Sequence, residues 1–166
     1  MAFHEAVEAV KPPNSLPKDV SDQLELARDL YAYVWFVYDF LAPAQLQALA
    51  TLELALRHRL PSPVLSRRRT LPTLLREAVK SGLITDEDFK AAAVPTPLRD
   101  KEWQSVATTG VVAPPGFTLE RAIGFLGSHR NALAHGDRLL WPDKLRILSI
   151  VVALLHCLYP ERSHEG

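Results

Sequence analysis

Prolines and glycines, which interrupt regular helices, divide this chain into apolar segments of helix length. This spacing limits the folds that the chain can adopt. The 13 prolines fall between apolar stretches and not in a low-complexity tract. Between these breaks the apolar residues recur at helical spacing, and no stretch alternates as a strand would. The sequence therefore predicts an all-α fold, a compact bundle of about five to six helices.

Recognisable start and stop residues bound the segments that we expect to be helical. Pro43 suits a first helical turn because its missing N–H costs nothing there, and Gly82 and Gly136 suit left-handed helix ends. Thr85 opens a capping-box spacing, and Thr118 is a favourable N-cap residue. The expected helices are 19–41, 43–60, 70–82, a short one after Thr85, 119–135, and one from Pro142 to before Pro160.

The chain is expected to form one domain. At 166 residues, of which 48% are hydrophobic, it is long enough to bury a core of its own. Residues 1–18 contain Pro12, Pro13 and Pro17 without sustained periodicity, so we expect a flexible leader there. The domain then covers 19–160, and 161–166 is a tail. The first long helix should present a stripe made of Leu24, Tyr31, Trp35, Tyr38 and Leu41.

The charge balance and the cysteine content limit the binding partners and the cellular compartment that we expect for this protein. The 19 basic residues balance the 19 acidic ones, so no whole-molecule field would draw the protein onto nucleic acid or a membrane. The single Cys157 cannot form an intrachain disulfide and is expected to be a buried small hydrophobe, which favours the cytoplasm. The longest apolar runs are about half the roughly 20 residues that span a bilayer, so no membrane partner is expected.

Arg130 and Glu53 each interrupt an apolar helical stripe. The stripe of Arg130 holds Leu119, Ile123, Leu126 and Leu133, and that of Glu53 holds Leu46, Leu49, Leu56 and Leu60. A buried guanidinium is costly unless a carboxylate or a phosphate meets its planar fork of donors. We therefore expect a Glu53–Arg130 ion pair, which by itself is equally consistent with a purely structural role.

A small or polar face lies beside that stripe on the same helix. It consists of Gly124, Gly127, Ser128, Asn131 and His135. Such a face permits the close approach of another helix or of a ligand. His135 at the helix end has a plainer explanation too, because a cationic imidazole near the last carbonyls stabilises a helix.

The segment Arg130-Asn131-Ala132-Leu133-Ala134-His135-Gly136 resembles the Arg-x4-6-His signature of HEPN domains. The upstream helix around Glu53 is similar to the helix that precedes the signature in that family. The resemblance implies a homodimer whose two signatures meet across the interface, acting as an endoribonuclease that needs no metal or other cofactor. It implies that His135 transfers protons and that Arg130 holds the phosphate, with Asn131 and Glu53 in supporting roles.

One position departs from the HEPN toxins that are paired with nucleotidyltransferase antitoxins. Those toxins often carry Tyr two residues after the signature histidine, whereas this chain has Asp137. Regulation by nucleotide transfer to that tyrosine is therefore not expected, although a cognate antitoxin or regulatory protein remains a possible partner.

Two further features bear on RNA binding, and both have plainer alternatives. A basic group could track an RNA backbone or be a solvated loop; it comprises Arg57, His58, Arg59, Arg67, Arg68 and Arg69. Trp103 and Trp141 could stack on bases or simply pack in the core. Zinc-ligand spacing and phosphate-binding glycine loops are not found in the sequence.

The function expected from the sequence is the cleavage of single-stranded RNA to 2′,3′-cyclic phosphate ends, in prokaryotic defence or stress response. The alternative is a noncatalytic HEPN module that binds nucleotide or RNA at the same place, or a helical protein that binds a partner.

Overall fold

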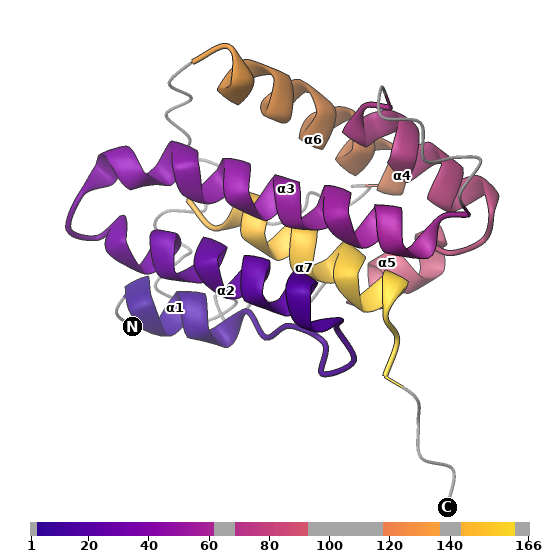
Figure 1. Ribbon diagram of the computed structural model, residues 1–166, viewed down its shortest axis with the longest axis horizontal. Coiled ribbons are helices and arrows are strands. Elements are labelled where there is room, and N and C mark those ends of the chain that lie inside the picture. Colours follow the sequence, from indigo (N-terminus) through magenta and orange to yellow (C-terminus); the bar gives the residue numbers. More distant parts are fainter. Residues whose placement is uncertain (1–2, 62–68, 93–117, 137–143, 162–166) are drawn as a thin grey trace, which may run out of the picture.

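Helices make up most of the part of the chain that the computed structural model describes, residues 3–61, 69–92, 118–136 and 144–161. Within those ranges there is no β-strand, so the expected all-α bundle is confirmed (Figure 1). The elements are α1 (Phe3–Ala9), α2 (Lys18–Tyr33), the 3-10 turn η1 (Tyr38–Phe40), α3 (Leu41–Arg59), α4 (Leu71–Lys80), α5 (Asp86–Ala92), α6 (Leu119–Ala134) and α7 (Arg146–Leu158).

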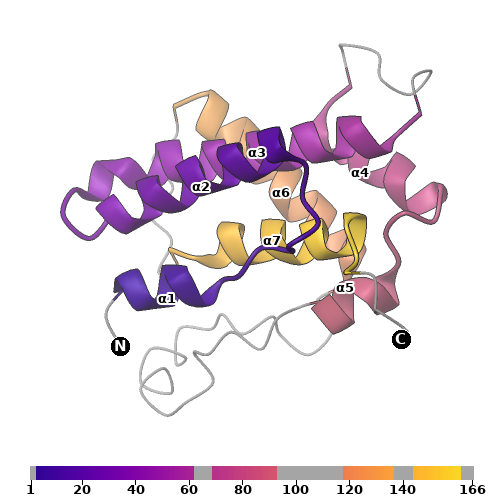
Figure 2. The same ribbon diagram turned by 60° about the horizontal axis from the view of Figure 1, so that its bottom comes forward.

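Helix α3 is the centre of the bundle. It packs against α2, α7, α4 and α6 (Figure 1). Helix α7 lies beneath the α2–α3 pair in Figure 2, with α5 packed against it. Nine of the 13 residues of α7 are buried and the other four are partly buried, because this helix is largely apolar and is covered on several sides. The core therefore forms around α3 and α7, and α6 with α4 closes one side of it.

The helix ends follow the sequence signals. The Thr118 side chain accepts the Arg121 N–H at 3.4 Å, and the Thr85 Oγ1 accepts the Asp88 N–H at 3.0 Å. Gly82 and Gly136 have φ of 72° and 80°, the left-handed conformation that ends α4 and α6. These positions confirm the capping residues that the sequence predicts.

The first long helix ends earlier than expected. Helix α2 stops at Tyr33, and the chain turns through residues 34–37 into η1 before α3 begins. Trp35 and Tyr38, which the helical stripe placed in the core, are exposed. The run of aromatic and β-branched residues here has weak helix propensity, and the turn lets α3 pack back along α2.

Residues 3–17, for which the sequence predicts a flexible leader, contact the rest of the bundle in this structure. Helix α1 buries Ala6 and Val7 in the core, and Val10, just beyond the helix, is buried with them. Beyond it, the Lys11 carbonyl bonds His156 at 3.0 Å, and the Ser15 hydroxyl donates to the Tyr159 carbonyl at 2.9 Å. This segment is therefore tied to α7 and to the residues that follow it by hydrogen bonds as well as by apolar packing.

Glu161, the first residue of the expected tail 161–166, also contacts the bundle, because it accepts a hydrogen bond from the Asn14 side chain at 2.9 Å. None of the described helices is both long enough and apolar enough to cross a membrane.

Candidate functional site

The Glu53–Arg130 pair forms as the two interrupted stripes predict. Arg130 projects from α6 and donates from its Nε to the Glu53 Oε1 on α3, at 3.1 Å. The two residues are 77 positions apart in the chain, so the pair ties two separate helices together. The guanidinium is thus held in a fixed direction by a charge-assisted hydrogen bond.

Arg130 is nevertheless not buried, although its position in an apolar stripe predicts burial. Its side chain is 44% exposed, while that of Glu53 is 20% exposed. The other members of its stripe are buried as expected. Helix α4 begins at Leu71 and meets α6 where Pro72 faces Gly127. Arg130 lies three residues farther along α6, and the exposed part of its side chain is accessible to an anion.

His135 and Asn131 lie at the C-terminal end of α6 and are both exposed. His135 is the C-cap residue, and its backbone N–H donates to the Asn131 and Ala132 carbonyls, each at 3.1 Å. Among the described residues no hydrogen bond joins the two side chains. Asn131 is therefore one turn from His135 as expected, but it does not orient the imidazole here.

The small and polar face of α6 divides into two parts. Gly127 faces α4, where an added Cβ would meet the ring of Pro72 at less than contact distance. Gly124 has open space around its Cα, and Ser128, Asn131 and His135 share its exposure. We call Gly124, Ser128, Asn131 and His135 the open face of α6. The close approach of another helix, expected from the sequence, thus occurs at Gly127 within the chain.

His129 is a residue of this region that the sequence analysis did not single out. It is only 3% exposed, and its Nε2 is 3.0 Å from the Oε1 of Gln45, which is 1% exposed. Burial lowers the pKa of His129, so its imidazole is neutral at neutral pH. Its helical spacing from Ala122, Leu126 and Leu133 could have indicated a core position.

Two aromatic contacts connect the start of α7 to this end of the bundle. The Arg146 guanidinium lies 5.2 Å from the centre of the Phe125 ring, and that ring stacks on His129 at 5.6 Å. Lys144 lies 5.1 Å from the centre of the Tyr38 ring. The start of α7 therefore contacts both α6, through Phe125, and η1, through Tyr38. The C-terminal end of α6, the start of α7 and the turn between α2 and α3 all lie on the left of Figure 1.

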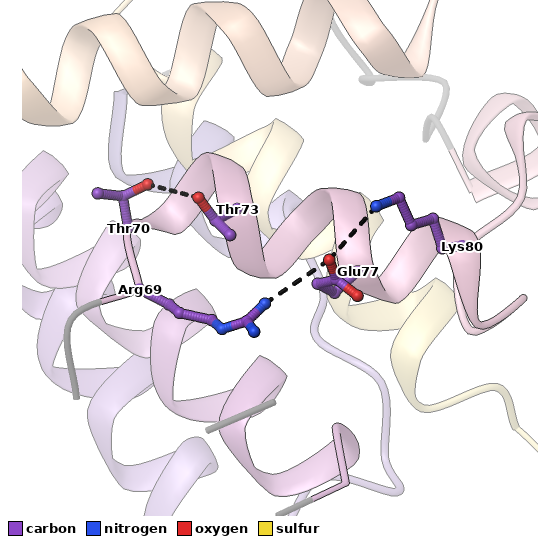
Figure 3. Close-up of polar contacts among 5 residues, drawn as sticks. All are labelled: Arg69, Thr70, Thr73, Glu77 and Lys80. Atoms are coloured by element: carbon purple, nitrogen blue, oxygen red, sulfur yellow. Dashed lines mark hydrogen bonds and ion pairs between the residues drawn. The ribbon is translucent and has the colours of Figure 1, made fainter. Parts of the chain in front are cut away.

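Of the four residues of the predicted basic group that the structure describes, His58, Arg59 and Arg69 make contacts with neighbouring side chains. His58 pairs with Asp19 at 3.1 Å, and the Arg59 guanidinium lies over the Tyr159 ring. Figure 3 shows Arg69 directed at Glu77 on α4, at 3.6 Å, where Glu77 also meets Lys80. Because these side chains already have partners, the basic group is better explained as ordinary solvated surface than as a surface that follows an RNA backbone.

Several sequence predictions lie outside the described residues. They concern Arg67, Arg68, Trp103, Asp137, Trp141 and Pro142. Within the described ranges, no three histidine, cysteine, aspartate or glutamate side chains gather as a metal site would require.

Comparisons of the chain with models of known protein families, with curated proteins and with solved structures found no match. The resemblance to HEPN domains stays a prediction from the signature residues.

Proposed function

We propose that this protein is an endoribonuclease of the HEPN type that cleaves single-stranded RNA without a metal ion. The observation that carries the proposal is the half-exposed Arg130, held by Glu53 at the end of α6 that also presents His135. A guanidinium that is fixed in direction and still accessible is suited to bind a phosphate. An imidazole one helical turn and a residue away is suited to transfer protons.

The chemistry requires only these two kinds of group because RNA supplies its own nucleophile. The 2′-oxygen attacks the adjacent phosphorus and gives up its proton, while the bond from phosphorus to the 5′-oxygen breaks and that oxygen takes up a proton. The products are a 2′,3′-cyclic phosphate and a 5′-hydroxyl. Arg130 would stabilise the charge that builds on the phosphate oxygens, and His135 would carry a proton in one of the two transfers.

The proposal includes a homodimer with the active site at the interface. Five helical positions separate Arg130 from His135, which places them about 140° apart around the axis of α6. Arg130 turns toward α3, whereas His135 belongs to the open face. A site in which both side chains contact one phosphate forms more easily when His135 of one copy approaches Arg130 of a second copy.

The cellular setting follows from the resemblance and remains part of the proposal. It comprises cytoplasmic RNA cleavage in prokaryotic defence or stress response, with a cognate antitoxin or regulatory protein as a possible partner. The free thiol of Cys157 is compatible with a reducing compartment.

A noncatalytic module that binds nucleotide or RNA is the alternative. One observation favours it, because no described side chain orients the His135 imidazole, whereas catalytic bases are usually held by a third group. Under this alternative Arg130 would still bind phosphate, but no strand would be cut.

RNA cleavage in the presence of EDTA tests the proposal. The purified protein should cut single-stranded RNA to cyclic phosphate ends and should leave DNA intact, since DNA lacks the 2′-hydroxyl. His135→Ala should reduce the cleavage rate by about 100- to 10,000-fold, the usual range for general acid–base catalysis. His4→Ala, which removes an exposed histidine of α1, is the matched control and should cleave normally.

Arg130→Lys tests the phosphate role separately. Lysine keeps the charge but loses the planar fork, so cleavage should fall while the fold persists. Arg76→Lys is its control, because Arg76 makes a similar exposed pair with Glu120 at 3.2 Å. Binding of RNA without cleavage by the unmodified protein would leave the noncatalytic module as the function.

A further inference from the structure

The helix that carries the signature is joined to α3 by one buried polar contact. Among the described residues, the buried polar or charged side chains are Gln45, Thr51 and His129. The Thr51 hydroxyl donates to the Gln47 carbonyl of its own helix at 2.9 Å. Gln45 and His129 instead meet each other across the α3–α6 contact at 3.0 Å.

This contact differs in kind from the rest of the α6 packing. The other buried residues of α6 are Leu119, Ala122, Ile123, Leu126 and Leu133. Apolar packing of this kind has little directional preference, so alone it would tolerate small rotations or shifts of the helix. A hydrogen bond between buried groups fixes a direction, because a misplaced partner leaves both groups desolvated and unpaired.

The contact also lies where it has the greatest influence on the proposed site. His129 directly precedes Arg130, and each residue turns the helix by about 100°. A fixed direction at His129 therefore sets the direction in which Arg130 leaves the helix, toward Glu53. The Arg146–Phe125–His129 stack holds the same imidazole from the side of α7.

We propose that the Gln45–His129 contact is a positioning pair that sets the rotation of α6, so that Arg130 meets Glu53 and faces the phosphate. His129 and Gln45 touch no substrate in this scheme and act through Arg130. The inference rests on the proposed function for its role in cleavage, but its geometric part can be tested without any activity.

The geometric test follows the Nε–H signal of Arg130 by NMR in the full chain. Gln45→Met removes the hydrogen bond and keeps a side chain of similar length. The Arg130 signal should then move toward its position in Glu53→Gln, in which the ion pair is broken. Gln45→Glu keeps an acceptor oxygen at the same place and should retain the original signal.

Thr51→Val is the matched control, because it removes a buried hydroxyl of α3 that bonds only within its own helix. It should leave the Arg130 signal unchanged. His129→Leu removes the same contact from the other side and serves as the second variant should Gln45→Met not fold. An Arg130 signal that stays in place in a folded variant lacking the contact would overturn the inference.

RNA cleavage supplies the functional test. Gln45→Met should lower cleavage by about 100-fold, the scale of loss that a misplacement of roughly 1 Å produces. In an Arg130→Lys background the same change should cause little further loss, because the group that it positions is already impaired. Independent losses that multiply would indicate a general structural role and would contradict the inference.

The two proposals fail in distinguishable ways. If the protein does not cut RNA but the Arg130 signal responds to Gln45→Met, the ribonuclease proposal fails and the positioning pair stands. If the protein cuts RNA and the signal does not respond, the positioning pair fails alone.

Discussion

At Gly127, helix α6 lies close against Pro72 of α4, and the lack of a side chain at Gly127 makes that approach possible. A Cβ there would overlap the ring of Pro72, which is held rigidly at the start of α4. Gly127→Ala should therefore push the helices apart. Overpacking of this kind costs about 1–3 kcal/mol, which should exceed the roughly 1 kcal/mol that alanine contributes to a helix interior.

Gly124→Ala is a close control for that substitution. Gly124 lies one turn earlier in the same helix, with nothing within 4 Å of the added Cβ. Its replacement should raise the free energy of unfolding by up to about 1 kcal/mol. Urea denaturation of the two variants at low protein concentration measures both effects. Equal changes in the free energy of unfolding would show that Pro72 moves aside for the new methyl group at little cost.

Glu53→Gln separates the stability of the Glu53–Arg130 pair from its orienting effect. Because the Arg130 side chain is 44% exposed, the pair should contribute no more than about 1 kcal/mol to stability. RNA cleavage should fall more clearly, since the guanidinium loses its fixed direction. Thermal unfolding and cleavage rates, measured on the same preparation, test this. A large loss of stability with unchanged cleavage would show that the pair stabilises the fold and does not orient Arg130 for cleavage.

The pair could be predicted from the sequence, but its exposure could not. Arg130 and Glu53 each interrupt an apolar stripe, and a helical bundle offers few other partners for such groups. The exposed fraction of Arg130 depends on how neighbouring helices pack around it, and the spacing within one helix does not reveal that packing. The helical spacing of His129 from Leu126 and Leu133 indicates a buried position, but that spacing does not identify its partner Gln45, which lies on another helix.

Helix α1 shows how a short element is missed when only long periodic segments are considered. It has seven residues, and its buried face consists of Ala6 and Val7, with Val10 just beyond it. Two turns are too few for a clear periodic signal, and the prolines that follow suggested a loose connection. The turn between α2 and α3 was missed because it contains no glycine or proline.

Val7→Ala tests the attachment of α1 to the domain. The Val7 side chain is buried, so removing its methyl groups should lower the free energy of unfolding by about 1.5–3 kcal/mol. Glu8→Ala changes an exposed neighbour and should stay within about 0.5 kcal/mol. Chemical denaturation of both variants gives the comparison. Equal stability of the two would mean that α1 is loosely held in solution.

Within the part of the chain that the structure describes, several large apolar side chains are exposed to solvent. Trp35 is 69% exposed and Phe36 is 79% exposed, at the turn between α2 and α3. The open face of α6 adds a second surface that lacks bulky side chains. Large exposed apolar groups commonly mark contact surfaces. We therefore expect sedimentation velocity at micromolar concentration to show a dimer of this chain.

Ser128→Arg places a bulky charge on the open face and should shift the dimer toward monomer. Glu87→Arg adds the same side chain at an exposed position of α5 and should leave the assembly intact. A monomer at all concentrations tested would remove the dimer from the proposal.

A mixing experiment then asks whether the two copies share each active site. If His135 of one copy works with Arg130 of the other, a dimer of one Arg130→Lys chain and one His135→Ala chain holds one intact site and one doubly altered site. Random exchange makes about half of the dimers mixed, so mixing equal amounts of the two inactive variants should restore about one quarter of the original cleavage rate. Sites confined to single chains would stay inactive however long the variants are mixed.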